Sequence, residues 1–324
     1  MRDSWMRTCG IWSSIMRSVV NNVVGKGLKL VATVPKGSPV LSYMGFADDK
    51  GSFPEYETLQ TRLEGNVAHV TLNRPKRGNA FNMTQWEELK HAMATVDVIG
   101  PARCVVLNGS NCNFSTGMDL TVFAEMMGMG KIESCDGRKR EGMMKIIDFF
   151  QAAISSPEDC RVPVIAAVEG HCIGAGVDLI TACDLRYATK DATFCIKETD
   201  LAMVADVGTL QRLPRIVGDQ RCRELAYTGR TFGGEEAQRM GLVLDVFDSA
   251  DEMYAHVAEV TQQIASKSPL TVRGIKRTAV FARDHPVEEG LQQVKMLNSS
   301  ILVSDDLQQA LGGLTTKQAP EFKN

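Results

Sequence analysis

The sequence lacks several features by which whole classes of protein are recognised. None of its apolar runs approaches the roughly 18 residues that a membrane-spanning helix needs. Its nine cysteines include no CxxC pair and no Cys/His cluster at zinc-ligand spacing, which favours free thiols over a disulfide framework. The five histidines show no ligand spacing either. We therefore predict no membrane span, no disulfide framework and no metal site.

A large excess of charge of one sign is also absent. The 324 residues carry a formal net charge of −3, with 44% hydrophobic and 23% charged residues, which is typical of an ordinary globular protein with a sizeable core. Residues 1–45 contain six of the 36 basic residues but only one of the 39 acids, so the rest of the chain is net acidic. An acidic body attracts nucleic acid poorly, and we predict no nucleic-acid partner.

The basic leader, residues 1–45, has the composition of a targeting segment. It is rich in Arg and Ser and poor in acids, and apolar residues such as Trp5, Ile11 and Ile15 recur at roughly helical spacing. These features are typical of a mitochondrial transit peptide; the alternative is a disordered basic extension or a surface helix with no targeting role. Because the final tripeptide, Phe322-Lys323-Asn324, is not an SKL-type peroxisomal signal, we expect a mitochondrial location, with the peroxisome as the alternative.

The remainder predicts an α/β architecture, because short apolar strands alternate with amphipathic helices. The expected strands are residues 66–72, 104–107, 164–168, 185–188 and 242–247. The expected helices are residues 83–96, 119–126, 143–154, 220–228, 234–240 and 249–266, with a polar interruption at 127–142. After Pro269 the pattern is wholly helical, over 270–282, 287–300 and 305–311. We predict a catalytic core at 56–265 and a C-terminal helical region at 266–324 that serves subunit contacts.

Two glycine-rich turns stand where a strand is expected to meet a helix. They are Ser115–Met118 and Gly174–Gly176. The first amides of a helix have no intrahelical partner and carry positive dipole character. Two such amides converging on one carbonyl oxygen would form an oxyanion hole. Taken singly, each turn is equally explained by the permissive backbone of glycine.

Three carboxylates lie just after the second turn in largely apolar sequence. Asp178 falls one turn into the expected helix, and Glu198 and Asp206 follow, with only Lys197 and Arg212 nearby as basic residues. Burial and mutual repulsion raise carboxylate pKa values toward the range useful for proton transfer. A helix-terminal charge for Asp178 and loop capping for the other two are the alternatives. Three acids beside two glycine turns favour acid–base chemistry.

Several stretches resemble a known family at this point. LNRPKRGNAFN, NFSTGMDL and VIAAVEGHCIGAGVDLITACDLRYA resemble the crotonase, or enoyl-CoA hydratase/isomerase, superfamily, and the resemblance covers about residues 56–315. Within it, IKETDLAMVADVGTLQRLPRIVG is similar to the Δ3,5-Δ2,4-dienoyl-CoA isomerases. The resemblance implies a ClpP-like ββα spiral core, C-terminal helices that assemble trimers or hexamers, and an acyl-CoA thioester substrate. It implies no cofactor beyond the coenzyme A of that substrate.

The resemblance also implies roles for individual residues. The amides of Met118 and Ala175 correspond to the oxyanion hole for the thioester, although the dienoyl-CoA isomerases usually have glycine at the position of Ala175. Asp206 corresponds to the base at C2, Glu198 to the acid at C6 and Asp178 to an auxiliary group. Hydratases carry two glutamates at the positions of Asp178 and Glu198 and usually glycine at that of Asp206, so the third acid separates the two activities.

Contacts with substrate and coenzyme A are implied in the same way. The loops that match the family's binding loops supply Arg77, Asn79, Ala80, Thr116, Gly117, Asp119 and Leu120. Lys276 matches a C-terminal basic position that can reach the CoA phosphates, sometimes across subunits. Arg77 is equally explained as an ordinary solvated arginine.

The function expected from residues and resemblance together is conversion of 3,5-dienoyl-CoA to 2,4-dienoyl-CoA in fatty-acid β-oxidation. One alternative is an enoyl-CoA hydratase that uses Asp178 and Glu198 on water. The other is a non-catalytic scaffold of the same fold that binds acyl-CoA or RNA. Neither the acyl-chain length nor the choice between trimer and hexamer follows from the sequence.

Overall fold

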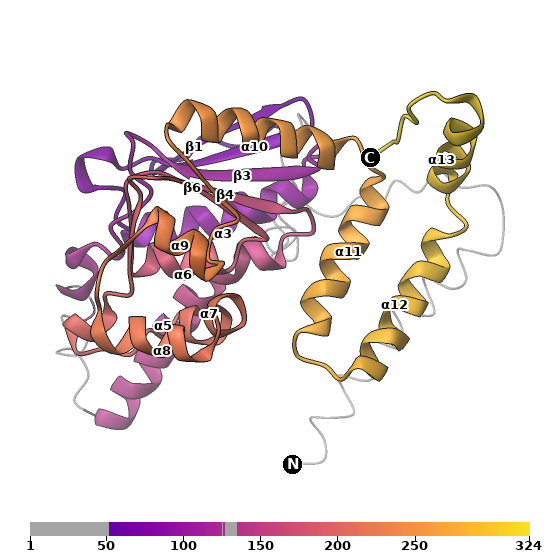
Figure 1. Cartoon of the computed structure of the whole chain (residues 1–324). Coiled ribbons are helices and arrows are strands. Elements are labelled where there is room, and N and C mark those ends of the chain that lie inside the picture. The colour runs from indigo at the N-terminus through magenta and orange to yellow at the C-terminus, as the bar shows by residue number, and fades with distance from the viewer. Residues whose placement is uncertain (1–51, 125, 127–134) are drawn as a thin grey trace, which may run out of the picture. The chain divides into compact units, whose positions relative to one another are not determined.

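The computed structural model describes residues 52–124, 126 and 135–324 (Figure 1). Contacts divide the chain into two units, residues 1–44 and 45–324, and all described residues belong to the second. The predicted targeting leader at 1–45 lies outside the described residues.

A six-stranded sheet forms the centre of the unit, in the order β1-β2-β3-β4-β6-β9. Its strands are β1 (Leu59–Glu64), β2 (Val67–Leu72), β3 (Cys104–Gly109), β4 (Val164–Val168), β6 (Leu185–Thr189) and β9 (Asp245–Phe247). The β1–β2 hairpin is antiparallel, and every following pair is parallel. Parallel strands need crossover connections, usually helical, and their carboxyl ends share one edge of the sheet, where loops can combine into a site.

A second, three-stranded sheet has the order β5-β7-β8. Its strands are β5 (His171–Ile173), β7 (Thr193–Cys195) and β8 (Phe232–Gly233). None of them was predicted, because two or three residues are too few to show the alternation that identifies a strand. This small sheet leads directly into the second glycine turn, since Gly174 follows β5.

Helices cover both faces of the large sheet (Figure 1). They are α3 (Met83–Val98), α5 (Asp136–Asp159), α6 (Ala175–Thr181), α7 (Thr209–Val217), α8 (Asp219–Thr228), α9 (Gly234–Met240) and α10 (Ala250–Ala265), with short 3₁₀ helices η1 (Pro75–Arg77) and η2 (Glu198–Leu201). On one face Met253 and Val257 of α10 pack in a small cluster with Val106, Ile165 and Tyr187. The main core lies on the other face, around α3, α5 and α6.

Trp86 is the largest fully buried side chain of this main core. Its ring lies 4.8 Å from that of Phe81 and 4.6 Å from that of Phe150, measured between centroids. Aromatic rings at such distances add to the stabilisation that burial of their area provides. Phe81 immediately precedes the capped start of α3, where the Asn82 side chain accepts a hydrogen bond from the Gln85 amide, so the core fixes the loop that holds the first glycine turn.

The α/β layering and most of the predicted elements are confirmed. Two predictions are corrected. The long helix α5 begins at Asp136 rather than at Met143, because residues 138–141, two arginines, a lysine and a glutamate, are good helix formers. The last strand begins at Asp245 rather than Leu242, since the amides of Leu242 and Val243 donate back to the Ala237 carbonyl of α9.

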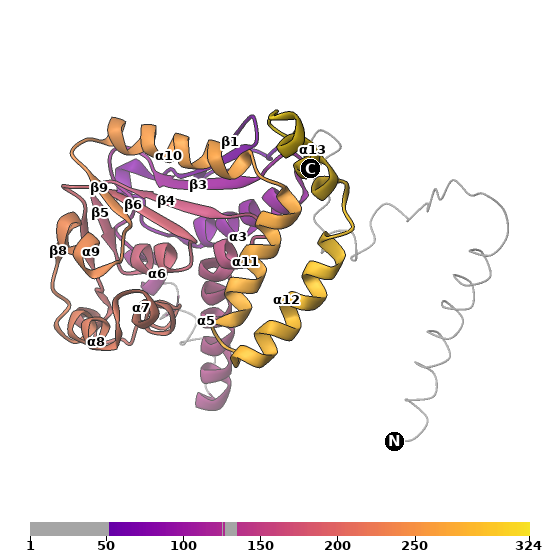
Figure 2. The same cartoon turned by 45° about the vertical axis from the view of Figure 1, so that its right-hand side comes forward.

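The C-terminal region is helical, as predicted, and consists of α11 (Pro269–Ala282), α12 (Val287–Ile301) and α13 (Asp305–Thr316). Figure 2 shows α11 and α12 side by side, with α11 nearer to the sheets and helices of the α/β core. The exposed faces carry many apolar side chains, including Ile275, Leu291, Met296 and Leu314. In the part of the chain that the structure describes, no helix is both long and apolar enough to cross a membrane.

Candidate active site

Two short stretches of backbone pairing bring the two glycine turns together. The Ser115 amide donates to the carbonyl of His171 and the Ile173 amide donates to the carbonyl of Ser115, at 2.8 and 2.9 Å. A second pairing holds the other side of the first turn, where the Phe81 amide donates to the Gly117 carbonyl and the Asp119 amide donates to the Phe81 carbonyl. The first turn is therefore fixed between the start of α3 and strand β5.

Glycine is required where the turns approach each other. Gly117 has a φ of +92°, and a Cβ atom there would lie 2.9 Å from the Ile173 carbonyl oxygen and 3.6 Å from the Ala175 amide nitrogen. Gly174 has a φ of +53°, and its Cβ would lie 3.2 Å from Oε1 of Glu198. Residues with side chains rarely adopt such φ values. Glycine at position 117 therefore lets the first turn lie close to the Ala175 amide. Glycine at position 174 lets the Glu198 carboxylate lie close to the second turn.

The two amides predicted for the oxyanion hole are available. Ala175 is the first residue of α6, and Met118 immediately follows Gly117. Within the described residues, neither amide donates to another backbone group. Both residues line one cavity, so the geometry is compatible with two N–H groups that stabilise one developing oxyanion.

This cavity, which we call the acid cavity, has a volume of about 510 Å³. Its lining includes these residues of the predicted site: Arg77, Ala80, Thr116, Gly117, Met118, Asp119, Leu120, Ala175, Asp178, Glu198 and Asp206. Apolar side chains that the sequence analysis did not assign complete the wall, among them Trp86, Phe123, Leu201 and Met203. In the sequence, the only signal for these wall residues is that they are hydrophobic and lie within residues 56–315, the range of the family resemblance.

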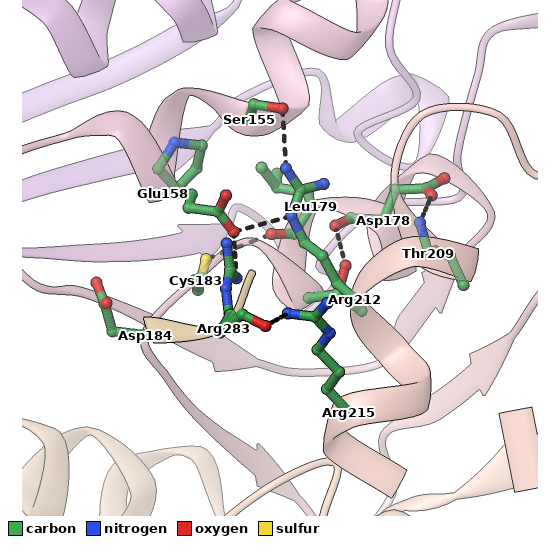
Figure 3. Close-up of polar contacts among 12 residues, drawn as sticks. Ser155, Glu158, Asp178, Leu179, Cys183, Asp184, Thr209, Arg212, Arg215 and Arg283 are labelled. Carbon is green, nitrogen blue, oxygen red and sulfur yellow. Dashed lines mark hydrogen bonds and ion pairs between the residues drawn. The ribbon is translucent and has the colours of Figure 1, made fainter. Parts of the chain in front are cut away.

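Asp178 is fully buried. Its Oδ1 accepts a hydrogen bond of 2.7 Å from the Thr209 amide, shown in Figure 3, while Oδ2 is buried without a hydrogen-bond partner in the described chain. Burial, and to a smaller extent the nearby charge of Asp206, raises the pKa of Asp178 to about 6, although the hydrogen bonds from Thr209 act in the opposite direction. A buried carboxylate with one unsatisfied oxygen is destabilising, so this residue is costly to the fold.

Glu198 and Asp206 enter the acid cavity from either end of one irregular segment. Burial and the charge of Asp178 raise the pKa of Glu198 to about 7, which makes it a proton donor or acceptor near neutrality. Burial also raises the pKa of Asp206, although that residue is more exposed. Its carbonyl accepts a hydrogen bond from the Gln151 side chain, which ties this end of the segment to α5.

A charged cluster of Arg212, Glu158 and Arg283 lies beside Asp178, as Figure 3 shows. Arg212 donates to Glu158 at 3.0 Å and to Ser155 at 2.9 Å, and Arg283 donates to the same Glu158 at 2.6 Å. The two guanidinium groups outweigh burial and lower the pKa of Glu158 to about 2. Because Arg212 is already paired with Glu158, it compensates the buried negative charge of Asp178 only weakly.

Two predicted contact residues, Asn79 and Lys276, make structural contacts within this chain and lie away from the acid cavity. Asn79 is fully buried, and its side-chain amide donates to the carbonyls of Ser110 and Asn113 while its oxygen accepts from the Arg74 amide. Lys276 is also buried; its ammonium group donates to the carbonyls of Pro157 and Val162. Neither residue lines the acid cavity.

Three contacts hold the Lys276 side chain in place. Its ammonium group lies 2.7 Å from the Asp184 carboxylate, and with the two carbonyls its three donors are satisfied. Loss of these contacts would leave a buried charge unpaired, so within this chain Lys276 is not free to reach a phosphate. Asp119 also has a structural role, pairing with Arg74 and accepting from the Thr121 amide, although it lines the cavity.

No group of three or more His, Cys, Asp and Glu side chains among residues 52–124, 126 and 135–324 is arranged to hold a metal ion. None of the eight cysteines in this part of the chain forms a disulfide bond. The chemistry available from these side chains is therefore proton transfer by carboxylates next to a pair of backbone donors.

Comparisons with known proteins agree with this geometry. Residues 62–324 match the family model described as "Enoyl-CoA hydratase/isomerase". The chain is 42% identical to the peroxisomal Δ(3,5)-Δ(2,4)-dienoyl-CoA isomerase of Arabidopsis thaliana over 84% of this chain and 98% of that protein. It is 39% identical to the mitochondrial enzyme of that name from Mus musculus over 81% of this chain and 80% of that protein.

Solved structures also match. The crystal structure of an enoyl-CoA hydratase from Bacillus anthracis superimposes with a TM-score of 0.74 at 28% identity, over 82% of this chain and 99% of that one. This similarity confirms the expected fold, an α/β core followed by C-terminal helices.

The raised pKa of Asp178 predicts that this residue destabilises the protein above pH 6. A carboxyl with a pKa of 3.8 unfolded and about 6 folded contributes most favourably below pH 4, and that stability is lost as the pH rises to 6. Asp178→Asn keeps an acceptor for the Thr209 amide but carries no charge. Its free energy of unfolding relative to wild type should therefore increase by about 2–3 kcal/mol from pH 4 to pH 8.

Urea denaturation at the two pH values measures this difference, and any constant cost of burying the new amide cancels. Asp191→Asn, which changes an exposed acid, serves as the control and should give the same difference from wild type at both pH values. A pH-independent difference for Asp178→Asn would contradict the prediction.

Proposed function

Because the chain belongs to the enoyl-CoA hydratase/isomerase family, we propose that it converts 3,5-dienoyl-CoA thioesters to 2,4-dienoyl-CoA thioesters in fatty-acid β-oxidation. The observation that carries the proposal is the third acid. Asp206 lines the same cavity as Glu198 and as the amides of Met118 and Ala175. The names of the two isomerases described above support the same assignment.

The two amides bind the thioester oxygen in this proposal. Removal of a proton from C2 places negative charge on that oxygen, and donors already fixed by the backbone stabilise the charge without reorganising. One such donor contributes roughly 2.7–4 kcal/mol to lowering a barrier. The methyl group of Ala175 leaves its N–H in place, so alanine fulfils the same role as glycine at this position.

Two carboxyl groups then carry out the transposition. Ionised Asp206 accepts the proton from C2, and the electron pair of that C–H bond enters a dienolate that extends from the thioester oxygen to C6. Protonated Glu198 donates its proton to C6, and the 2,4-diene results. Asp206 finishes protonated and Glu198 ionised, so exchange of both protons with solvent restores the starting state.

Asp178 adjusts the acid in this scheme. Its charge raises the pKa of Glu198, which keeps that group protonated closer to neutral pH. We assign it this auxiliary role because its Oδ1 is already engaged by the Thr209 amide.

Coenzyme A contacts come from the rim of the acid cavity in this proposal. Arg77 and Thr116 are exposed there, beside the buried backbone of Ala80. Arg77 supplies a positive charge for phosphate. No metal or additional cofactor takes part in the proposed reaction.

A hydratase would need only Asp178 and Glu198 and a water molecule. The third carboxylate favours the isomerase, because a base over C2 and an acid over C6 must be separate groups. A non-catalytic scaffold that binds acyl-CoA or RNA is disfavoured, since raised pKa values of all three acids would bring no benefit to simple binding.

We further propose that the protein forms trimers, or hexamers made of two trimers, through the C-terminal helices. The exposed apolar side chains of α11, α12 and α13, such as Ile275, Met296 and Leu314, support this assignment. The curated relatives are named as mitochondrial or peroxisomal enzymes. We propose the mitochondrion for this chain, on the composition of residues 1–45.

Incubation of the purified protein with 3,5-octadienoyl-CoA should generate the ultraviolet absorption of a conjugated 2,4-dienoyl thioester. Asp206→Asn keeps the size of the side chain but removes the base, so kcat should fall by about 10²–10⁴-fold. Circular dichroism checks that the variant is folded. Near wild-type isomerisation by folded Asp206→Asn, or hydration of a 2-enoyl-CoA with no isomerisation, would refute the assignment.

The pH dependence of kcat/KM should identify the acid. Glu198 must be protonated, so activity should decline as the pH rises through about 7, the pKa of that group. In Asp178→Asn the neighbouring negative charge is gone, the pKa of Glu198 falls, and the decline should move to lower pH. A decline that stays at the same pH in this variant would exclude Glu198 as the titrating acid.

Fusion of residues 1–45 to a fluorescent reporter should direct it to mitochondria in transfected cells. Replacement of Arg2, Arg7 and Arg17 by glutamine removes every arginine and half of the six basic residues of the leader, and because such leaders are rich in arginine it should leave the reporter in the cytosol. Cytosolic fluorescence from the unmodified fusion would show that the leader has another role.

A further inference from the structure

Asp206, the proposed base, lies in a short turn that leads into α7. We call residues 206–209 the base turn. Contacts hold it at both ends, because the Gln151 side chain donates to the Asp206 carbonyl at 2.6 Å and the Thr209 amide donates to Asp178 at 2.7 Å. Between these ends lies Gly208, which is buried. The position of the base therefore also depends on what contacts Gly208.

Arg212 of α7 packs directly against the middle of the base turn. A Cβ atom on Gly208 would lie 1.9 Å from Nη1 of Arg212 and 3.2 Å from its Cζ, so the guanidinium group occupies the space that a side chain would need. Gly208 also has a φ of +134°, which residues with side chains rarely adopt. The Arg212 amide donates to the Gly208 carbonyl at 3.0 Å. Both the backbone and the side chain of Arg212 therefore hold the base turn.

The guanidinium group of Arg212 is itself fixed by α5. It donates through Nε to Glu158 at 3.0 Å and through Nη2 to Ser155 at 2.9 Å, as Figure 3 shows. The side chains of Arg212 and Glu158 are only 12% and 15% exposed. Hydrogen bonds between charged partners are shorter and stronger than neutral ones. Arg212 therefore forms a rigid link between α5 and the base turn.

We propose that Arg212 is a positioning residue for the base: it holds Gly208 so that the Asp206 carboxylate stays beside C2 of the substrate. This inference rests on the proposed function, in which Asp206 removes the C2 proton. The rate of such a step depends steeply on geometry, and a displacement of about 1 Å can cost about 10²-fold. Because Glu158 neutralises the charge of Arg212, the effect on the base is one of position.

Arg212→Met keeps an unbranched side chain but removes the guanidinium group. We expect kcat for 3,5-octadienoyl-CoA to fall by about 10–100-fold while KM stays within about threefold of wild type, because the base is displaced and the substrate contacts are not. Rates are expressed per binding site, counted by calorimetric titration with 2,4-octadienoyl-CoA, so that unfolded protein does not contribute.

The pH profile separates position from charge. The low-pH limb of kcat reports ionisation of Asp206, and in Arg212→Met it should stay at the same pH below a lowered plateau. If the charge of Arg212 acted on the base instead, its removal would raise the pKa of Asp206. A limb that moves to higher pH below an unchanged plateau would therefore overturn the inference.

Arg283→Met is the matched control. Arg283 donates to the same Glu158 at 2.6 Å, but it follows α11 and belongs to neither α7 nor the base turn. Its replacement leaves the contact between Arg212 and Gly208 in place, so kcat should stay within about threefold of wild type. Equal losses in Arg283→Met and Arg212→Met would show that the pairing of Glu158 is what matters, and would overturn the inference.

Gly208→Ala tests the contact from the other side. The added methyl group displaces the guanidinium group, so kcat should fall by about tenfold or more. If the two residues act as one unit, the combination with Arg212→Met should be no more than about threefold slower than the slower single variant. Losses that multiply in the double variant would show that the two residues act independently.

A partial reaction separates the base from the acid. In Glu198→Gln the proton donor at C6 is missing, so Asp206 takes the C2 proton, exchanges it with solvent at its exposed position and returns a solvent proton to C2. In D2O this variant should place deuterium at C2 without isomerisation, which mass spectrometry detects. Adding Arg212→Met should slow the exchange by about 10–100-fold.

No exchange in Glu198→Gln, or exchange that Arg212→Met leaves unchanged, would overturn the inference while wild-type isomerisation still supports the proposed function. Wild-type protein that fails to isomerise 3,5-octadienoyl-CoA would instead reject the proposed function, and the positioning role with it.

Discussion

The pairing of Ser115 with Cys172 is the constraint on which the site depends. Two hydrogen bonds join the loop after β3 to strand β5, and through them two glycine turns far apart in the chain come into van der Waals contact. Gly109, at the end of β3, shows how closely this loop is packed, because a Cβ there would collide with the Asn113 and Phe114 backbone. The two amides that we propose as oxyanion donors are therefore positioned by backbone contacts that leave no room for side chains.

This close packing also explains why the buried carboxylates lower the stability of the fold. The wall behind Asp178 is filled by α6 and by the Arg212–Glu158 pair, so water cannot solvate Oδ2. A fold selected only for stability would place an amide or an apolar residue there. The destabilisation is nevertheless useful, because the same burial and repulsion that weaken the fold raise the pKa values of Asp178 and Glu198 to about 6 and 7, where proton transfer is efficient.

Much of the fold and the centre of the site could be predicted from sequence. The strand Val164–Val168 is an unbroken apolar run, and the helix Met83–Val98 begins at a side-chain cap, Asn82. The three acids and the two turns are recognisable by residue type. The small sheet of β5, β7 and β8 could not be predicted, because its strands are short and paired only through tertiary contacts. Nor could the buried roles of Asn79 and Lys276, since a polar residue that satisfies distant carbonyls resembles a ligand-binding residue until the fold is known.

The irregular segment from Glu198 to Asp206 connects these observations. Its 3₁₀ turn ends at Ala202 in the left-handed conformation, and the Met203 amide returns to the Glu198 carbonyl. This compact turn places the two carboxylates at opposite ends of the segment, with Met203 between them in sequence and also lining the acid cavity. A regular helix over these nine residues would place their side chains on successive turns of one cylinder. In the proposed reaction this irregular backbone keeps the base, Asp206, and the acid, Glu198, at separate points of the acid cavity, as a proton transfer between C2 and C6 requires.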